Sequence, residues 1–549
     1  MSTEFKRPLA NPRSLSDTGF SYVINGLQTH SSYGAKALKA FIPFRQGGEA
    51  ELSALFGDMD VIRAFSLENP GLVSEILSCL CECKEMGLSL QRCMEGNLSM
   101  VELFEIKTFL LRTEKIRNIL ESELGASLPE RYRLRVTTPL LDVLDPQKER
   151  FDTFYIYDSF SEKLAKLRKE RKDLELELRR TQKEIRTRLE AEHGFHMTPK
   201  FELIVPKANK SLMELAESIS ELRREEEDYM TVVFKLTPNE KIYELQRRGE
   251  GLAALIEDEE DIVRAALTEK IAEQRDVLAS NGETVGRIDL DLAKALYANE
   301  HNCVRPQIVK EHIIEIVDGR SLELEDILNA KGKRYCPVSV NLSDGVTAIT
   351  GANMGGKTVS LKMIGQVALL AQYAMYVPCA KARIGLSNFV QVLIGDSQNL
   401  QRGLSSFGSE MEELKEILDH AVDRSIIIID EIASGTNPSE GLALTRSFIS
   451  YFSKRPYISL VTTHFDHAAV GPGVKNLRVR GLAGADFKKL QKELETANRK
   501  QRIEILGRYM DYRLEEVEGS SPAPRDALNI AKILGVYDEI IDEARFYLL

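Results

Sequence analysis

The chain has 549 residues and is 43% hydrophobic, with 73 Lys or Arg residues against 84 Asp or Glu residues and a formal net charge of −11. This length predicts about two to four domains with substantial apolar cores. The acidic balance excludes a protein that binds nucleic acid through overall positive charge, so any such contact must be local.

The N-terminal residues carry no targeting signal. They read Met1-Ser-Thr-Glu-Phe-Lys-Arg-Pro, without the apolar core of a signal peptide. No uninterrupted apolar run approaches the length of about 20 residues that spans a bilayer. We therefore expect a cytoplasmic protein that makes no membrane contact.

Seven cysteines with irregular spacing predict reduced thiols and not a disulfide framework. Cys79, Cys81, Cys83 and Cys93 resemble a metal-binding cluster at first sight. Residues 71–83, however, have a helical pattern, and residues two apart on a helix point about 200° apart, so these thiols cannot all converge. Buried reduced cysteines are therefore the favoured interpretation.

Residues 1–300 are helical by pattern, and a coiled-coil arm is predicted in the middle of the chain. One apolar seam with heptad spacing comprises Leu164, Leu167, Leu174, Leu178 and Ile185. After a break that contains Pro199 and a short predicted strand at 201–205, a second seam comprises Leu212, Leu215, Ile219 and Leu222. Two such helices joined by a turn predict the arm.

The charge of the predicted arm permits two interpretations. Residues 163–188 hold eleven Lys or Arg against five acidic residues, a local net charge of +6. These cations could contact the phosphates of a nucleic acid, or they could simply keep a coiled coil solvated. No aromatic residue lies among them, so stacking on single-stranded bases is not indicated.

A phosphate-binding loop is predicted between an apolar strand at 346–350 and a helix that includes 361–370. The loop glycines are Gly351, Gly355 and Gly356. They let backbone amides converge on phosphate oxygens, and the helix directs its positive end toward the same place. Lys357 would reach the terminal phosphates, and the Thr358 hydroxyl would contact Mg²⁺.

A second predicted strand, 425–429, ends in two carboxylates. Its continuous run of isoleucines is typical of a parallel strand buried on both faces. Asp430 is expected to hold Mg²⁺, and Glu431 to orient or deprotonate the attacking water.

A third predicted strand, 457–463, ends at His464. A histidine at a strand end beside the phosphate loop is placed to sense the terminal phosphate, and we assign it this catalytic role. The alternative is a structural histidine.

Together these motifs resemble the MutS mismatch-repair ATPases. The core of the loop, Asn353-Met354-Gly-Gly-Lys357, is much narrower than the general nucleotide-binding pattern. Further matching motifs, in family order and at family spacing, are Val377-Pro-Cys-Ala-Lys-Ala-Arg-Ile384, Ser405-Ser-Phe-Gly-Ser-Glu410, Asp430-Glu-Ile432, Gly435-Thr436 and Thr463-His464. Departures are Ser321-Leu322, where the family has His-Pro, Ala352, where it has Pro, and Thr358-Val359, where it has Ser-Thr.

The resemblance implies the fold and its domains. Residues 305–549 are expected to form an α/β P-loop ATPase domain of the ABC type, with a mostly parallel sheet and C-terminal helices. An all-α lever region, 1–160, is expected to precede it, with a coiled-coil clamp arm inserted at 161–232. Residues 233–304 are expected to be the returning lever helices.

The resemblance also implies a site shared between two chains. ATP and Mg²⁺ are the expected cofactors, and Ala352, Asn353 and Met354 join the glycines, Lys357 and Thr358 as nucleotide contacts. Ser405 matches the serine that completes a partner's phosphate pocket in this family. The alternative is an ordinary Ser-capped amphipathic helix. A homodimer, or a heterodimer with a related subunit, is expected.

Two functions remain open. The first is an ATPase that moves clamp arms on duplex or junction DNA; because the chain begins at the lever region, it is not expected to recognise mismatches unaided. The second is remodelling of a protein client, because compact relatives look like the reactivating factors of cobalamin-dependent aminomutases. The first is favoured because the family as a whole binds DNA.

Overall fold

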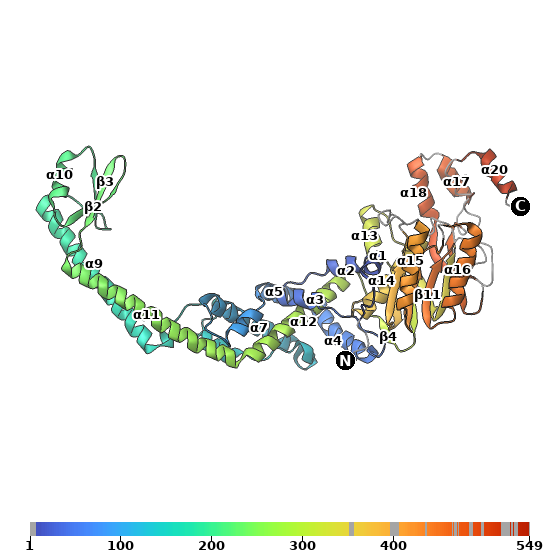
Figure 1. The fold of residues 1–549 in the computed structure, drawn as a ribbon, viewed down its shortest axis with the longest axis horizontal. Coiled ribbons are helices and arrows are strands. Elements are labelled where there is room, and N and C mark those ends of the chain that lie inside the picture. The colour runs from blue at the N-terminus through green and yellow to red at the C-terminus, as the bar shows by residue number, and fades with distance from the viewer. Residues whose placement is uncertain are drawn as a thin grey trace. The chain divides into compact units, whose positions relative to one another are not determined.

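The computed structural model describes residues 7–350, 356–395, 406–433, 436–463, 465, 469, 471–482, 487–495, 499–517, 528, 531 and 536–547. The chain folds as two compact units (Figure 1). The first contains Met1–Cys81, Ile119–Arg133 and Thr284–Leu549, and the second contains Glu82–Asn118 and Leu134–Glu283. Among the described residues, no helix combines the length and apolar character needed to cross a bilayer.

The first unit is built on a sheet of six strands within the described residues. In spatial order these are β13 (Asp511–Glu516), β12 (Val474–Gly481), β7 (Gly345–Thr350), β11 (Tyr457–Thr462), β10 (Ser425–Ile429) and β9 (Phe389–Leu393). The strands from β12 to β9 are parallel, and β13 is antiparallel to β12. The predicted α/β class with a mostly parallel sheet is therefore confirmed.

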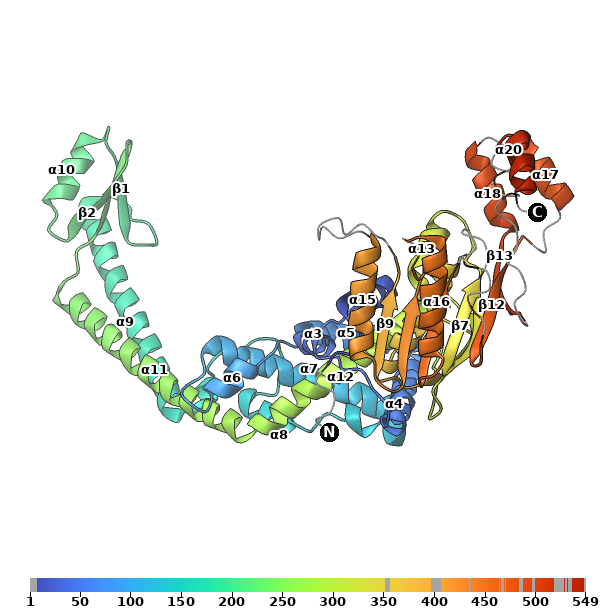
Figure 2. The same cartoon turned by 45° about the vertical axis from the view of Figure 1, so that its right-hand side comes forward.

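Both faces of this sheet are covered, which explains the isoleucine run of β10. Ile426 and Ile428 pack in a core with helix α14 (Lys357–Gln372). Ile427 and Ile429 pack in a second core with α15 (Ser406–His420) and α16 (Pro438–Phe452), which lie in front of the sheet in Figure 2. Successive side chains of a strand point to opposite faces, so a strand between two helical layers must be apolar at every position.

A second sheet and a group of N-terminal helices complete the first unit. The sheet has the order β4 (Gln307–Val309), β8 (Lys381–Gly385), β5 (Ile313–Gly319) and β6 (Val338–Ser343). The N-terminal helices are α1 (Pro12–Asp17), α2 (Phe20–Gly26), α3 (Ser32–Lys39) and α4 (Glu49–Glu68). Apolar residues of this N-terminal segment, such as Phe20 and Phe56, share the core of α14.

The N-terminal segment also covers an edge of the main sheet. Val390 of the edge strand β9 donates its N–H to the Leu9 carbonyl at 2.8 Å. The Val392 N–H donates to Ser14 Oγ at 2.9 Å. An exposed edge strand invites unwanted pairing, and these hydrogen bonds remove that hazard. The first unit is consequently larger than the region 305–549 expected for the ATPase domain.

Outside the arm described next, the other helices of the described residues are α5 (Pro70–Glu82), α6 (Gly87–Arg92), α7 (Met100–Leu124), α8 (Thr138–Leu144), α12 (Arg275–Glu300), α13 (Leu322–Ala330), α17 (Phe487–Glu495), α18 (Arg499–Tyr509) and α20 (Asp538–Phe546). Short 3-10 helices lie at Gly125–Ser127, Glu130–Tyr132 and Asp158–Phe160.

The second unit contains a long two-helix arm (Figure 1). Helix α9 (Glu162–His193) pairs with α11 (Glu240–Glu273) through a seam in which Leu174, Leu245 and Leu252 are buried. Each helix has a capped start, because Ser161 accepts a hydrogen bond from the Leu164 N–H and Asn239 accepts one from the Ile242 N–H. Such caps satisfy amides that have no partner within the helix.

The tip of the arm differs from the sequence prediction. Between α9 and α11 the chain forms β1 (Glu202–Pro206), α10 (Lys210–Ser218), β2 (Leu222–Glu227) and β3 (Thr231–Leu236), with β3 central in an antiparallel sheet. The predicted strand at 201–205 is confirmed as β1. The second heptad seam, however, is not the main partner of the first. Leu212, Leu215, Ile219 and Leu222 pack in the core of this tip, around Phe234, and Ile185 is the member of the first seam that packs against this core.

None of the seven cysteines forms a disulfide bond, and no group of His, Cys, Asp and Glu in the described part of the chain is arranged to hold a metal ion. Cys79, Cys83 and Cys93 are buried, whereas Cys81 is exposed. Helical geometry separates Cys79 from Cys81, as the spacing predicted.

Candidate active site

Three neighbouring parallel strands end at one edge of the main sheet, and residues predicted to bind nucleotide and Mg²⁺ follow these strand ends. β11 lies between β7 and β10, so the ends of all three strands are adjacent. β7 leads to the glycine-rich loop, β10 leads to Asp430 and β11 ends at Thr462. Ligands of open α/β sheets bind at the carboxyl ends of such strands.

The last glycine of the loop is required by its backbone and its surroundings. Gly356 precedes α14 with φ of 75°, in the left-handed region where side chains are strained. A Cβ built there would lie 2.9 Å from Cδ1 of Tyr512. Glycine at this position therefore permits both the turn into α14 and the close approach of the Tyr512 ring.

Lys357 is the first residue of α14, and its side chain is buried, with 4% of its surface exposed. Burial lowers the pKa of its ammonium group, and the carboxylates of Glu431 and Asp430 act in the opposite direction. A buried cation costs free energy unless negative groups lie near it. The two predicted carboxylates thus lie close enough to influence the predicted lysine.

Asp430 connects the ends of β10 and β11 to the first turn of α14 through hydroxyl groups. The Thr358 hydroxyl donates to Asp430 Oδ2 at 2.5 Å, and the Thr462 hydroxyl donates to Asp430 Oδ1. Thr462 Oγ1 in turn accepts a hydrogen bond from the Glu431 N–H at 2.8 Å. Hydroxyl and carboxylate oxygens are the ligands that Mg²⁺ prefers, so Thr358 and Asp430 fit this ion chemically.

The turn after β10 has an uncommon backbone. Glu431 and Ala433 have φ of 60° and 57°, which non-glycine residues rarely adopt. The Ala433 N–H donates to Glu410 Oε1 of α15 at 2.7 Å, and burial raises the pKa of Glu410. Strained backbone of this kind persists where surrounding contacts hold it, often at functional sites.

Several predicted residues lie outside the described residues. They are Gly351, Ala352, Asn353, Met354, Gly355, Ser405 and His464. Of the predicted set, the structure brings together Lys357, Thr358, Asp430 and Glu431. Sequence reasoning missed Thr462, although a hydroxyl at the end of an otherwise mostly apolar strand was a usable signal.

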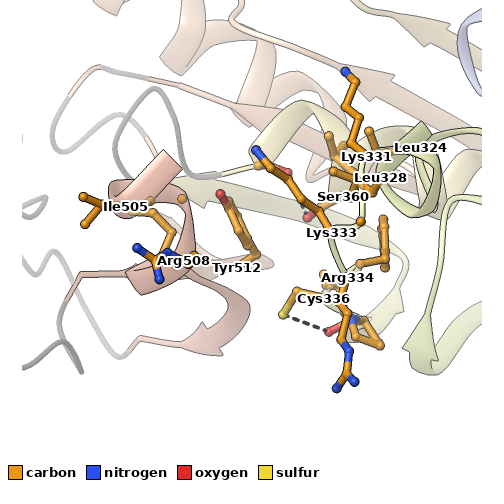
Figure 3. A pocket seen from close by; sticks show the side chains of 18 of the residues that line it. Leu324, Leu328, Lys331, Lys333, Arg334, Cys336, Ser360, Ile505, Arg508 and Tyr512 are labelled. Atoms are coloured by element: carbon orange, nitrogen blue, oxygen red, sulfur yellow. Dashed lines mark hydrogen bonds between the residues drawn. The ribbon is translucent and has the colours of Figure 1, made fainter. Parts of the chain in front are cut away.

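A cavity of about 1460 Å³ opens beside the first turn of α14 (Figure 3). Its wall includes Gly356 and Ser360, the segment 331–338, and Arg508 and Tyr512 from the opposite side. Gly356 is the last glycine of the glycine-rich loop and also lines this cavity. The cavity therefore borders the junction between that loop and α14.

Comparisons with known proteins agree with this geometry. The family model described as MutS domain V matches residues 347–546, which include β7, α14, β10 and β11. Proteins named Endonuclease MutS2 are similar to this chain. The relative from Clostridium botulinum strain Langeland is 32% identical over 286 residues, which cover 52% of this chain and 33% of the relative.

Two further relatives carry the same name. That of Symbiobacterium thermophilum is 32% identical over 312 residues, covering 56% of this chain and 36% of the relative. That of Agathobacter rectalis is 31% identical over 299 residues, covering 53% and 34%. The chain thus spans about a third of the length of these relatives. The matched segment and the relatives together support a MutS-family protein, with residues 347–546 similar to domain V of that family.

Proposed function

We propose that this protein is an ATPase that binds Mg²⁺ and ATP at the carboxyl ends of β7, β10 and β11 and uses hydrolysis to move the two-helix arm. The observation that carries the proposal is the hydrogen bond from Thr358 to Asp430. It joins the start of the phosphate-loop helix to the carboxylate that ends β10, so two motifs that are 72 residues apart form one oxygen-lined site.

The proposed roles divide among few residues. The loop from Gly351 to Gly356 donates backbone amides to phosphate oxygens, and Lys357 donates from its ammonium group. Thr358 and Asp430 would hold Mg²⁺, which when bound offsets the charge of the phosphates. The Glu431 carboxylate orients the attacking water and accepts its proton, and His464 contacts the terminal phosphate.

We also propose where the nucleoside lies. The cavity beside Gly356 exceeds the roughly 300 to 1,000 Å³ typical of ligand pockets, so it has room for a base and a ribose. The Tyr512 ring on its wall offers an aromatic surface close to the loop.

The proposed site is shared between two chains, with Ser405 of each chain completing the other's phosphate pocket. Mixing Ser405→Arg chains with Lys357→Ala chains should test this. Each variant alone should turn over little ATP. In a mixed dimer both lesions fall on one pocket and the other pocket is intact, so mixing should restore up to about half of wild-type turnover per site. Absence of recovery in confirmed mixed dimers would contradict a shared pocket.

DNA is the proposed polymer on which the arm acts. An endonuclease acts on nucleic acid, so the name of the relatives, Endonuclease MutS2, supports this assignment. The expected result is that purified protein hydrolyses ATP in the presence of Mg²⁺ and that duplex or junction DNA raises the rate by about twofold or more. DNA that leaves both the rate and nucleotide affinity unchanged would contradict this part of the proposal.

One observation favours a second candidate, the remodelling of a protein client. The end of β2 and the turn after it carry Glu225 to Asp228 followed by Tyr229 and Met230, whose exposed fractions are 92% and 68%. Exposed apolar side chains beside carboxylates are more suited to a protein surface than to phosphates. Adding an inactivated cobalamin-dependent aminomutase in place of DNA distinguishes the two: recovery of the aminomutase with ATP, and no response to DNA, would favour the client.

A further inference from the structure

The arm helix α9 has a strongly segregated charge pattern. We call Lys169, Lys172, Arg179, Arg180 and Lys183 the outer basic face. At about 100° per residue, these five side chains fall within an arc of about 100° of the helix. The seam that contacts α11, with Leu167, Leu174 and Leu178, lies about 170° away on the opposite side. The five cations therefore point into solvent, and all five are exposed.

Four other cations of α9 are engaged in ion pairs. Lys163 lies 2.8 Å from Glu259, and Arg168 lies 2.6 Å from both Asp158 and Glu260. Arg171 pairs with Glu175, and Arg188 pairs with Glu221. These ion pairs neutralise part of the positive charge of α9 within the protein, without any external partner.

The cations of the outer basic face lack such ion pairs. In the described arm, none of its five members has a carboxylate oxygen within 4.0 Å of its charged nitrogens. Glu170 and Glu177 turn instead toward Arg248 and Lys241 of α11. Asp173 and Glu184 border the face on one side only. Cations needed only for solubility would be interspersed with anions, so their segregation requires another explanation.

The tip of the arm has the opposite charge. Residues 194–239 hold six Lys or Arg and eight Asp or Glu, a net charge of −2. Four consecutive acidic residues, 225–228, occupy the end of β2 and the start of the β2–β3 turn. Glu225 and Glu227 form ion pairs with cations of the tip, so the tip presents no excess of positive charge. A polyanion would therefore be attracted to the outer basic face of α9 and not to the tip.

We propose that the outer basic face of α9 is the surface along which the phosphate backbone of duplex DNA lies, and that the tip is not a DNA contact. The face extends over 14 residue steps, or about 21 Å at 1.5 Å per residue. One strand of a duplex presents a phosphate about every 3.4 Å along the axis, so about six phosphates fit this length.

The absence of aromatic residues between 169 and 183 favours a duplex over a single strand, because single strands are usually held by base stacking. The proposal rests on the proposed function only in naming DNA as the polymer. It requires no ATP turnover, so it is tested in the absence of nucleotide.

The experiment compares two triple variants of the full chain that lose the same charge. One is Lys172→Gln with Arg179→Gln and Lys183→Gln, on the outer basic face. The control is Lys200→Gln with Lys207→Gln and Lys210→Gln, at the tip. Fluorescence anisotropy of a labelled duplex, titrated at several salt concentrations, gives the affinity and the slope of log affinity against log salt.

We expect the α9 variant to reduce the magnitude of this slope by about 2.7, since each lost phosphate contact removes about 0.9. Its affinity should fall by at least about tenfold at moderate salt, whereas the tip control should stay within about twofold of wild type. Exchanging Lys and Arg at the same three positions keeps the charge and should keep the wild-type slope. Glutamine is a good helix former, so circular dichroism should show no loss of helix.

Three results would overturn the inference: a wild-type chain that does not bind duplex at low salt, an α9 variant with the wild-type slope, or a tip control with the larger loss. A chain that binds duplex as expected but hydrolyses no ATP would instead refute the proposed ATPase. The two failures are therefore distinguishable.

Discussion

Replacing Glu431 by Ala should lower ATP turnover by at least about a hundredfold while nucleotide affinity stays within about threefold of wild type. The reason is that Glu431 follows the carboxylate that contacts Thr358, and its proposed partner is the attacking water. Loss of the proton acceptor should block the chemical step and leave the phosphate contacts intact. Single-turnover hydrolysis and equilibrium nucleotide binding measure the two effects separately.

The same variant should accumulate ATP-bound dimers, which light scattering can detect, because in the proposed mechanism a closed pair of chains would open only after hydrolysis. Glu416→Ala provides a control, since Glu416 is an exposed carboxylate on α15 that lies away from the strand ends. Turnover by Glu431→Ala at the control rate would contradict the assigned role. A loss of nucleotide binding as large as that expected for Lys357→Ala would also contradict it.

Replacing Lys357 by Ala should weaken ATP binding by at least about a hundredfold and abolish turnover at ordinary ATP concentrations. The Lys357 ammonium group is buried beside two carboxylates, and burial lowers its pKa. A cation is held in such a place at a cost in free energy, and a bound triphosphate would offset that cost. Isothermal titration with a non-hydrolysable ATP analogue measures the loss.

Lys362→Ala is the matched control, because Lys362 lies on the same helix but more than one turn beyond the loop. Its nucleotide affinity should stay within about twofold of wild type. Similar losses in both lysine variants would indicate damage to α14 and not the removal of a phosphate contact.

Much of the candidate site could be predicted from local spacing. The strand, glycine loop, lysine and threonine of 346–358 are contiguous, so their chemistry is readable without a fold. The isoleucine run before Asp430 predicted a strand covered on both faces, and the two cores on either side of β10 confirm it. Thr462 was missed because its role depends on β11 lying between β7 and β10, an order that spacing along the chain does not encode.

The arm illustrates the same limit. The heptad pattern of 164–185 predicted helix α9 correctly, but its partner was assigned to the next apolar repeat in the sequence. The actual partner is α11, which starts after the whole tip sheet. Periodicity states which face of a helix is apolar and does not state which other apolar face covers it.

The sequence by itself therefore determined the residue chemistry: the phosphate loop, the paired carboxylates, the helical arm and its excess of positive charge. Only the tertiary structure decided which strands are neighbours, which helix pairs with α9, and which arm cations are neutralised by ion pairs. The physical reason is that motifs and helix faces follow from residues close in the chain, whereas strand order, helix pairing and ion pairs depend on contacts between residues far apart in it.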